Sequence, residues 1–323
     1  MNYVELTNEQ RRQLIDMQQA FRVWRPAVET LDALGTMRVQ TSKGSRYVYE
    51  VHSTVRKSLG RETPALKKKK ADHDAQRNDL QKRVRQLDKR LAAAAPVNRA
   101  LRLGSMREIV ARILRLLDRE QLLGSHVIVA GTNALHAYEV SAGVMISSEH
   151  VATTDADILW DTKQSLLLAA TGIRKEGLMG LLRRVDKSFV ADYGYNATNR
   201  DGFIVDLLCP ENDDGLTMNA GSDLEAAPMT GAEWLLQSPQ HEQIIIAEDG
   251  FPVRMVVPEP RTYALHKLWV SQRSDRTPIK RPRDVAHARI VGELSTKYLG
   301  LKFRAGEMPW LKKPLIQQLK LLK

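Results

Sequence analysis

The stretch from Pro64 to Ala95 limits the possible folds of this chain more than any other, because it consists almost entirely of Lys, Arg, Asp, Gln, Leu and Ala. Its apolar residues at helical spacing form a single stripe: Leu80, Val84, Leu87 and Leu91. A helix with one narrow apolar stripe can bury only that stripe. We therefore expect a long exposed helix, or a coiled-coil arm, that ends at Pro96.

Positive charge is concentrated in this part of the chain. The formal net charge is +11, and residues 55–90 hold thirteen Lys or Arg against five Asp or Glu, a net of +8. Residues 301–323 hold six against one, a net of +5, so the remainder is slightly acidic. Because Lys and Arg release counterions when they contact phosphates, we expect residues 67–90 to bind a nucleic acid. A solvated helix with a basic face is the alternative.

Several classes of protein are disfavoured by composition. No run of about 18 apolar residues is present, so we expect no membrane partner. The N-terminus lacks the basic-then-apolar pattern of a secretory signal. The only cysteine is Cys209, which excludes an internal disulfide and a cysteine-cluster zinc site. These features predict a cytoplasmic protein.

Two kinds of periodicity divide the chain. Residues 7–34 have apolar positions at helical spacing behind a possible capping box of Thr7 and Gln10. From residue 126 short apolar strands alternate with helices, and helices dominate after Pro260. Strands are predicted at His126–Ala130, Asp155–Trp160, Phe189–Tyr195, Phe203–Leu208, Gln243–Ala247 and Pro252–Val257. We expect an α+β protein with an N-terminal helical region (1–100), a core (101–258) and a C-terminal helical region (259–323).

Asp155 and Asp157 are separated by one residue in a predicted strand, so their side chains project from the same face. Two adjacent carboxylates repel each other unless a cation lies between them, and Mg²⁺ prefers carboxylate and phosphate oxygens. The pair therefore predicts a metal site. A strand end with two exposed acids is the alternative.

The turn Gly131-Thr132-Asn133 joins a predicted strand to a predicted helix. Glycine lets the backbone approach a phosphate, the helix start supplies N–H groups, and the Thr132 hydroxyl can bond a phosphate oxygen. A third acid, Asp206, interrupts the apolar run Phe203–Leu208, where an isolated charge is costly to bury. A metal ion would remove that cost, and so would a neighbouring basic residue.

The order of a Gly-Thr turn, an Asp-x-Asp strand and a later strand aspartate resembles the polymerase-beta-like nucleotidyltransferases. The closer likeness is to bacterial nucleotidyltransferase-like proteins of the AbiEii-related toxin group. It extends from Val127 to about Val291. Leu265-His266-Lys267-Leu268 and Lys280-Arg281-Pro282-Arg283-Asp284 match the helix lysine and the Arg-x-Lys/Arg-Asp motif of that group.

The resemblance implies a core of mixed sheet flanked by helices. It implies that Asp155, Asp157 and Asp206 hold two Mg²⁺ ions, with Mn²⁺ as a possible substitute. Lys267 would act catalytically, and the NTP would be bound by Gly131, Thr132, Asn133, Arg281, Arg283 and Asp284, with Lys280 as a further candidate. Asp284 could instead cap the following helix.

The activity implied by the resemblance is transfer of NMP from an NTP to an acceptor hydroxyl. The basic arm favours RNA, and tRNA in particular, as the acceptor. The likeness also implies a possible toxin role with an antitoxin partner. A degenerate fold that only binds nucleic acid or protein, and nucleotidylation of a protein, are the alternatives.

Overall fold

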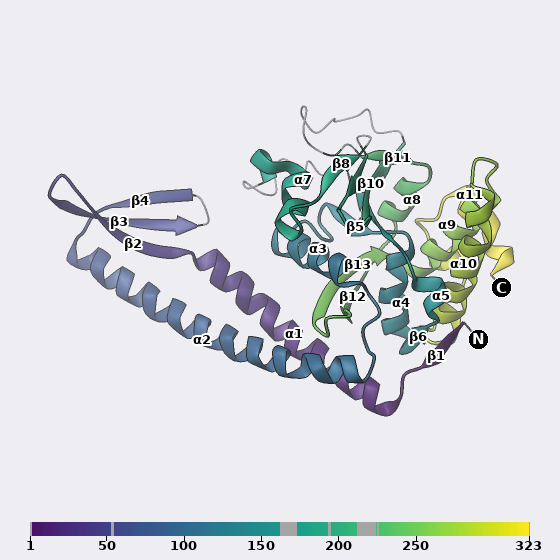
Figure 1. The fold of residues 1–323 in the computed structure, drawn as a ribbon, viewed down its shortest axis with the longest axis horizontal. Coiled ribbons are helices and arrows are strands. Elements are labelled where there is room, and N and C mark those ends of the chain that lie inside the picture. Colours follow the sequence, from purple (N-terminus) through teal and green to yellow (C-terminus); the bar gives the residue numbers. More distant parts are fainter. Residues whose placement is uncertain are drawn as a thin grey trace.

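In the computed structural model a long arm projects from a body of mixed sheet and helices (Figure 1). The structure describes residues 2–52, 55–161, 173–192, 195–211, 224 and 226–322. The body has a mixed sheet with helices packed around it. This architecture confirms the predicted α+β class.

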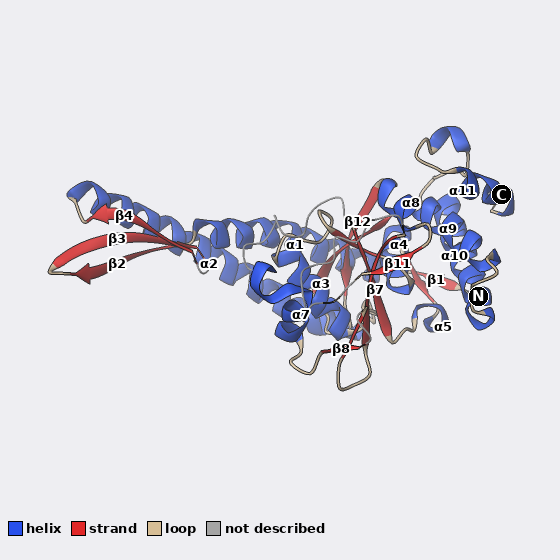
Figure 2. Cartoon of the chain, turned by 90° about the horizontal axis from the view of Figure 1, so that it is seen from above, coloured by secondary structure: helices blue, strands red, loops and turns tan. Residues whose placement is uncertain are grey.

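The arm is built from two antiparallel helices, α1 (Asn8–Leu34) and α2 (Pro64–Ala100), which pack along one another. At its far end the chain between them forms an antiparallel sheet in the order β2 (Thr36–Ser42), β3 (Ser45–His52) and β4 (Val55–Arg61). Seen from above, this sheet lies beside the start of α2 (Figure 2).

The ends of the arm helices follow from local sequence. Thr7 and Gln10 form the predicted capping box at the start of α1, and Thr63 caps α2 ahead of Pro64. Along α2, Val84 and Leu91 from the predicted stripe are buried. The arm therefore buries one stripe and leaves its charged faces in water, as expected.

The prediction that Pro96 ends α2 is wrong, because the helix continues through it to Ala100. A proline inside a helix removes one hydrogen bond and crowds the preceding turn. Here the turn after Pro96 is held from outside. Asn98 is fully buried, accepts a hydrogen bond from Gln13 Nε2 (2.7 Å) and donates one to the carbonyl of Gly250 (2.7 Å). The first bond joins α2 to α1 within the arm, and the second fixes the arm to the body.

The central sheet has the order β5-β7-β10-β9-β8, and β11 pairs with the end of β10. Its strands are β5 (Val127–Val129), β7 (Asp155–Trp160), β8 (Val190–Asp192), β9 (Asn196–Thr198), β10 (Ile204–Pro210) and β11 (Ala227–Met229). β7 and β11 run parallel to β10, and the other pairs are antiparallel. β9 lies between β8 and β10, so the predicted strand at Phe189–Tyr195 is not the direct neighbour of the one at Phe203–Leu208.

Helices and a second hairpin cover the sheet. They are α3 (Glu108–Arg119), η1 (Thr132–Ala134), α4 (Leu135–Ala142), α5 (Ser148–Val151), α7 (Ile173–Val185), α8 (Ala232–Gln237) and the hairpin β12 (Gln240–Ile246) with β13 (Pro252–Pro258). The chain's first strand, β1 (Tyr3–Glu5), pairs with β6 (Val144–Ile146) in the body.

The C-terminal region consists of α9 (Pro260–Gln272), η2 (Pro278–Lys280), α10 (Arg281–Lys297), η3 (Ala305–Glu307), α11 (Lys313–Ile316) and η4 (Gln317–Leu321). Leu265 of α9 and Val291 of α10 belong to the same buried cluster as Ile158 and Val205 of the sheet. One hydrophobic core therefore holds α9 and α10 against the central sheet. Among the residues described, no helix is both long and apolar enough to cross a lipid bilayer.

The contacts of Asn98 give a first prediction. Asn98→Ala leaves the buried carbonyl of Gly250 without this donor, which costs about 1–3 kcal/mol. Urea unfolding followed by circular dichroism should show that loss in the free energy of unfolding. Asn78→Ala, at an exposed site of the same helix, should change it by less than about 0.5 kcal/mol. Equal effects of the two substitutions would refute the anchoring role.

Candidate active site

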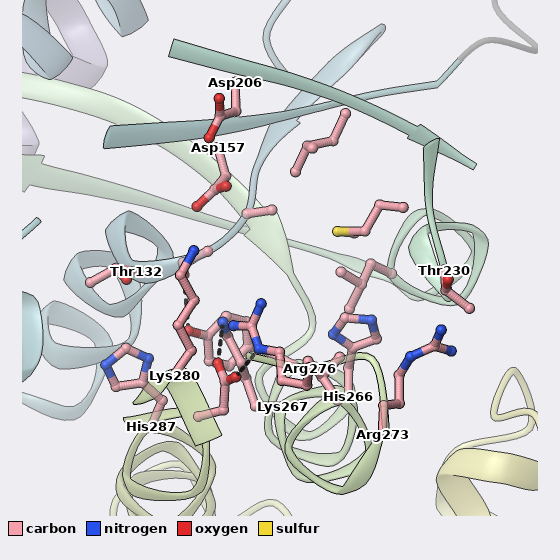
Figure 3. A pocket seen from close by; sticks show the side chains of 18 of the residues that line it. Thr132, Asp157, Asp206, Thr230, His266, Lys267, Arg273, Arg276, Lys280 and His287 are labelled. Atoms are coloured by element: carbon pink, nitrogen blue, oxygen red, sulfur yellow. Dashed lines mark hydrogen bonds and ion pairs between the residues drawn. The ribbon is translucent and has the colours of Figure 1, made fainter. Parts of the chain in front are cut away.

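A pocket of about 360 Å³ lies between the central sheet and the helices α9 and α10. Its walls come from the turn after β5, from β7 and β10, from α9, and from the chain that leads into α10. Figure 3 shows the aspartates of the strands on one side and basic side chains of the helices on the other. The pocket therefore joins parts of the chain that lie more than a hundred residues apart.

The three predicted acids all line this pocket. β7 and β10 are parallel, and their register places Asp206 directly beside Asp157. Asp155 lies two residues before Asp157 and therefore on the same face. The intervening Ala156 and the neighbouring Val205 are buried on the opposite face. Strand alternation and register together bring the acids into one cavity.

The pKa values of Asp157 and Asp206 are raised in this pocket. Burial, followed by the charges of Asp155 and Asp206, raises the pKa of Asp157 to about 6, although Lys267 and Lys280 oppose the shift. Burial and the charge of Asp155 also raise the pKa of Asp206, and Lys280 again opposes this. A cation in the pocket would relieve the repulsion between the carboxylates.

The donor chemistry of these acids fits a divalent cation with oxygen ligands. In the described part of the chain, however, no three His, Cys, Asp or Glu side chains already lie close enough together to hold a metal ion. The carboxylate of Asp155 instead accepts a hydrogen bond from the hydroxyl of Thr153. A shared ion would require the carboxylates to move closer together.

Gly131 shapes the opposite edge of the acid cluster. Its φ of +57° is in the left-handed region, and a Cβ built on it would lie 1.7 Å from Oδ2 of Asp157. No other residue type can occupy this position without moving the carboxylate. The hydroxyl of Tyr263 on α9 donates to the carbonyl of Gly131 (2.9 Å), so the turn is fixed from the helix side.

The other two residues of the predicted phosphate turn differ in position. Thr132 lines the pocket, and the short helix η1 begins at this residue. Asn133 is buried and outside the pocket lining, and its amide donates to the backbone carbonyl of Asp155 (2.9 Å). Asn133 is therefore placed to hold β7 in position rather than to contact a phosphate.

Lys267 and Asp284 meet in an ion pair at 3.0 Å. The second oxygen of Asp284 accepts from Nε of Arg276 at 2.6 Å, and the carboxyl side chain is 3% exposed. Burial alone would raise its pKa, but the charges of Lys267 and Arg276 bring it below the usual value. Asp284 makes no capping bond at the start of α10. Its carboxylate orients two cations, which leaves it poorly placed to bind an anionic phosphate itself.

Of the two predicted arginines, one lines the pocket and the other does not. Arg283 lines the pocket and donates to the backbone carbonyl of Ala152. Arg281 lies outside the lining, and its guanidinium donates to the carbonyls of Arg273 (2.9 Å) and Arg276 (3.1 Å). Arg281 therefore closes the loop between α9 and α10, and Lys280 extends into the pocket in its place (Figure 3).

Sequence reasoning missed three lining residues on α9, Tyr263, His266 and Val270, and Arg273 directly after the helix. Tyr263 lies four residues before Lys267 and Val270 three residues after it, which places both on its side of the helix, and His266 is its direct neighbour. This helical spacing around Lys267 was the signal that could have identified them. Burial and the charge of Lys267 lower the pKa of His266 to about 3, so this imidazole is uncharged at neutral pH.

A family model described as a nucleotidyltransferase matches residues 108–308. The matched region contains every candidate site residue named above and excludes the arm. Neither the curated proteins nor the solved structures include a match to this chain.

Because the pKa of Asp157 is raised, ionisation of this carboxyl should lower the stability of the folded state in a pH-dependent way. Between its unfolded pKa of 3.8 and its folded pKa of about 6, the folded state holds more protons, so metal-free stability falls as pH rises through this window. Asp157→Asn removes this cost. Because Asp157 is half-buried at the pocket wall and partly screened by water, we expect a gain of on the order of 1–2 kcal/mol at pH 8.

Chemical unfolding in the presence of a chelator, repeated from pH 4 to pH 8, measures this gain. Asp192→Asn, at an exposed position in β8 of the same sheet, is the control and should follow wild type throughout. A pH profile of Asp157→Asn parallel to wild type would contradict the electrostatic account.

Proposed function

The chain belongs to this nucleotidyltransferase family, whose model covers 108–308 of its 323 residues, and from this premise we propose that it moves NMP from an NTP to an acceptor hydroxyl with the help of Mg²⁺. One observation carries the proposal. Asp155, Asp157 and Asp206 line the same pocket as the Gly131 turn and a row of basic side chains. Three carboxylates opposite basic groups that could neutralise a triphosphate support a metal-dependent transfer.

We assign the metal to the acids on the strands. Asp155, Asp157 and Asp206 would hold two Mg²⁺ ions, or Mn²⁺ in their place, once Asp155 turns away from Thr153. Bound there, the ions supply Lewis-acid stabilisation of the charge that develops on the phosphoryl oxygens. The raised pKa values of Asp157 and Asp206 support this assignment, since a cation would lower the free energy of their charged forms.

The remaining lining residues bind and orient the triphosphate. Thr132 and the turn at Gly131 offer a close approach to phosphate oxygens, and Lys280 and Arg283 supply positive charge from the helix side. Lys267, held by Asp284, either contacts a phosphate or assists the acceptor. The acceptor oxygen forms a bond to the α-phosphorus, the bond to the β-phosphate breaks, and pyrophosphate leaves. The hydroxyl proton passes to a pocket carboxylate or to water.

RNA is our proposed acceptor, with tRNA preferred, because the arm presents Lys and Arg outside the matched family region. A role as a toxin with an antitoxin partner is an extension of the same proposal. The clustering of all three acids in one pocket favours an enzyme over a degenerate binding module. Protein nucleotidylation uses the same chemistry, and chemical identification of the labelled product separates it from RNA modification.

Removal of any one of the three acids should abolish transfer. With Asp155→Ala, Asp157→Ala or Asp206→Asn, incorporation of label from each NTP into cell extract with Mg²⁺ should fall by at least about 100-fold, because charge stabilisation by the metal is worth several kcal/mol. Circular dichroism should remain that of wild type. Asp192→Asn, in the same sheet but outside the pocket lining, should keep full activity. Wild-type incorporation by any pocket variant would refute the two-metal assignment.

The salt dependence of RNA binding tests the arm. Lys67, Lys68 and Lys69 are exposed and Lys70 pairs with Asp74. Replacing all four lysines with Gln should reduce the slope of log affinity against log salt by roughly 0.7–0.9 for each phosphate that the arm no longer binds. The control replaces four lysines elsewhere in the chain with Gln and so removes the same charge: Lys302, Lys312, Lys313 and Lys320. A slope unchanged by the arm substitutions would show that these lysines only solvate the helix.

A further inference from the structure

The sheet at the end of the arm has one covered face and one open face. Val48 and Met37 lie on the covered face and are 0% and 5% exposed, because this face packs toward the arm helices. Glu50, the only acid in these three strands, is paired with Met37 across β2 and β3 and therefore shares their face. Among the described helices, none packs on the opposite face in Figure 2.

Strand register identifies the side chains of this open face, which we call the tip face. Across β2 and β3, Arg38 is paired with Tyr49 and Gln40 with Tyr47. Across β3 and β4 the same row continues with Arg56, Ser58 and Arg61, opposite Val51, Tyr49 and Tyr47. The tip face thus combines two tyrosines with three arginines and carries no acidic side chain among the residues that the structure describes.

One arginine and one tyrosine of this face already stack on each other. The guanidinium of Arg56 lies 3.5 Å from the centre of the Tyr49 ring. Arg56 reaches over β3 and donates to Gln40 on β2, so it lies flat across the sheet. A planar, positively charged group on a tyrosine ring occupies the position that a nucleobase takes on an aromatic side chain.

The net positive charge of the arm is greatest at this end. Residues 36–61 hold six Lys or Arg and one Asp or Glu, a net of +5, whereas residues 8–34 of α1 hold four of each. Lys67, Lys68 and Lys69 extend the positive region onto the start of α2. The surface therefore complements a polyanion.

We propose that the tip face binds single-stranded RNA, with bases stacked on Tyr47 and Tyr49 and phosphates held by Arg38, Arg56 and Arg61. Stacking needs unpaired bases, because the bases of a duplex are already stacked on each other. The choice of RNA rests on the acceptor class in the proposed function, but binding itself needs neither NTP nor metal.

The length of the arm restricts the shape of such an RNA. α2 has 37 residues and therefore spans about 55 Å, with its C-terminal end fixed to the body through Asn98. An RNA held at the tip could place a hydroxyl in the pocket only if it extends over a comparable distance. The geometry thus selects an elongated, folded RNA with an unpaired loop remote from the hydroxyl that reacts.

The test measures the affinity of the full-length protein for a fluorescent single-stranded RNA of about 12 nucleotides by anisotropy, without NTP or Mg²⁺. Tyr47→Ala with Tyr49→Ala should weaken binding by on the order of 10-fold or more, and Tyr47→Phe with Tyr49→Phe should retain it, since the ring suffices for stacking. Replacing Arg38, Arg56 and Arg61 with Gln should lower the slope of log affinity against log salt by about 2.

The matched control replaces three exposed arginines elsewhere, Arg12, Arg22 and Arg289, with Gln, and should leave the affinity and slope unchanged. The proposal fails if the arginine variants of the tip face behave like this control, if both tyrosine variants bind as wild type, or if duplex RNA or polyglutamate binds as tightly as the single strand.

The two proposals can fail separately. Asp157→Asn should bind the oligonucleotide like wild type even though it lacks transfer activity. If the tip face does not bind RNA but transfer is intact, the catalytic assignment still stands. If the tip face binds RNA but the protein has no transfer activity, only the binding surface remains.

Discussion

The parallel pairing of β7 with β10 is the constraint on which the pocket depends. Its register sets Asp206 beside Asp157 and, on the other face, packs Val205 beside Ala156 in the core. A slip by one residue would turn Asp206 into the core and Val205 into the pocket. The hydrophobic face therefore specifies the position of the acids, and the free energy of core packing offsets their mutual repulsion.

A second acid–base group connects the helices to this sheet. Asp284 joins Lys267 of α9 to Arg276 of the following loop, and Tyr263 of α9 bonds the Gly131 turn. A buried ion pair costs desolvation energy and often adds little net stability, but removing one partner leaves an unpaired charge. Its value here is positional, because it fixes which cations face the carboxylates.

Sequence patterns predicted the elements that depend on the local spacing of apolar residues and on turn residues. The strand at Asp155–Trp160, the Gly131 turn, the helix from Pro260 to Gln272 and the hairpin of β12 and β13 all follow from periodicity. The partners of single side chains do not, because they depend on tertiary contacts. For this reason the sequence did not predict that Arg281 lies outside the pocket lining, that Lys280 extends into the pocket, or that Asp284 pairs with two cations. It also did not predict that α2 continues past Pro96, which depends on Asn98.

The arm leaves and re-enters the body at fixed points. β1 pairs with β6 just before α1 begins, Asn98 bonds Gly250 as α2 ends, and the three-stranded sheet joins the other two helix ends. Helices lose structure most readily at free ends, where few hydrogen bonds must open. Neither arm helix has such an end. Melting of the arm must therefore start with release of an anchor, which keeps so long and polar a projection straight although its own buried cluster is small.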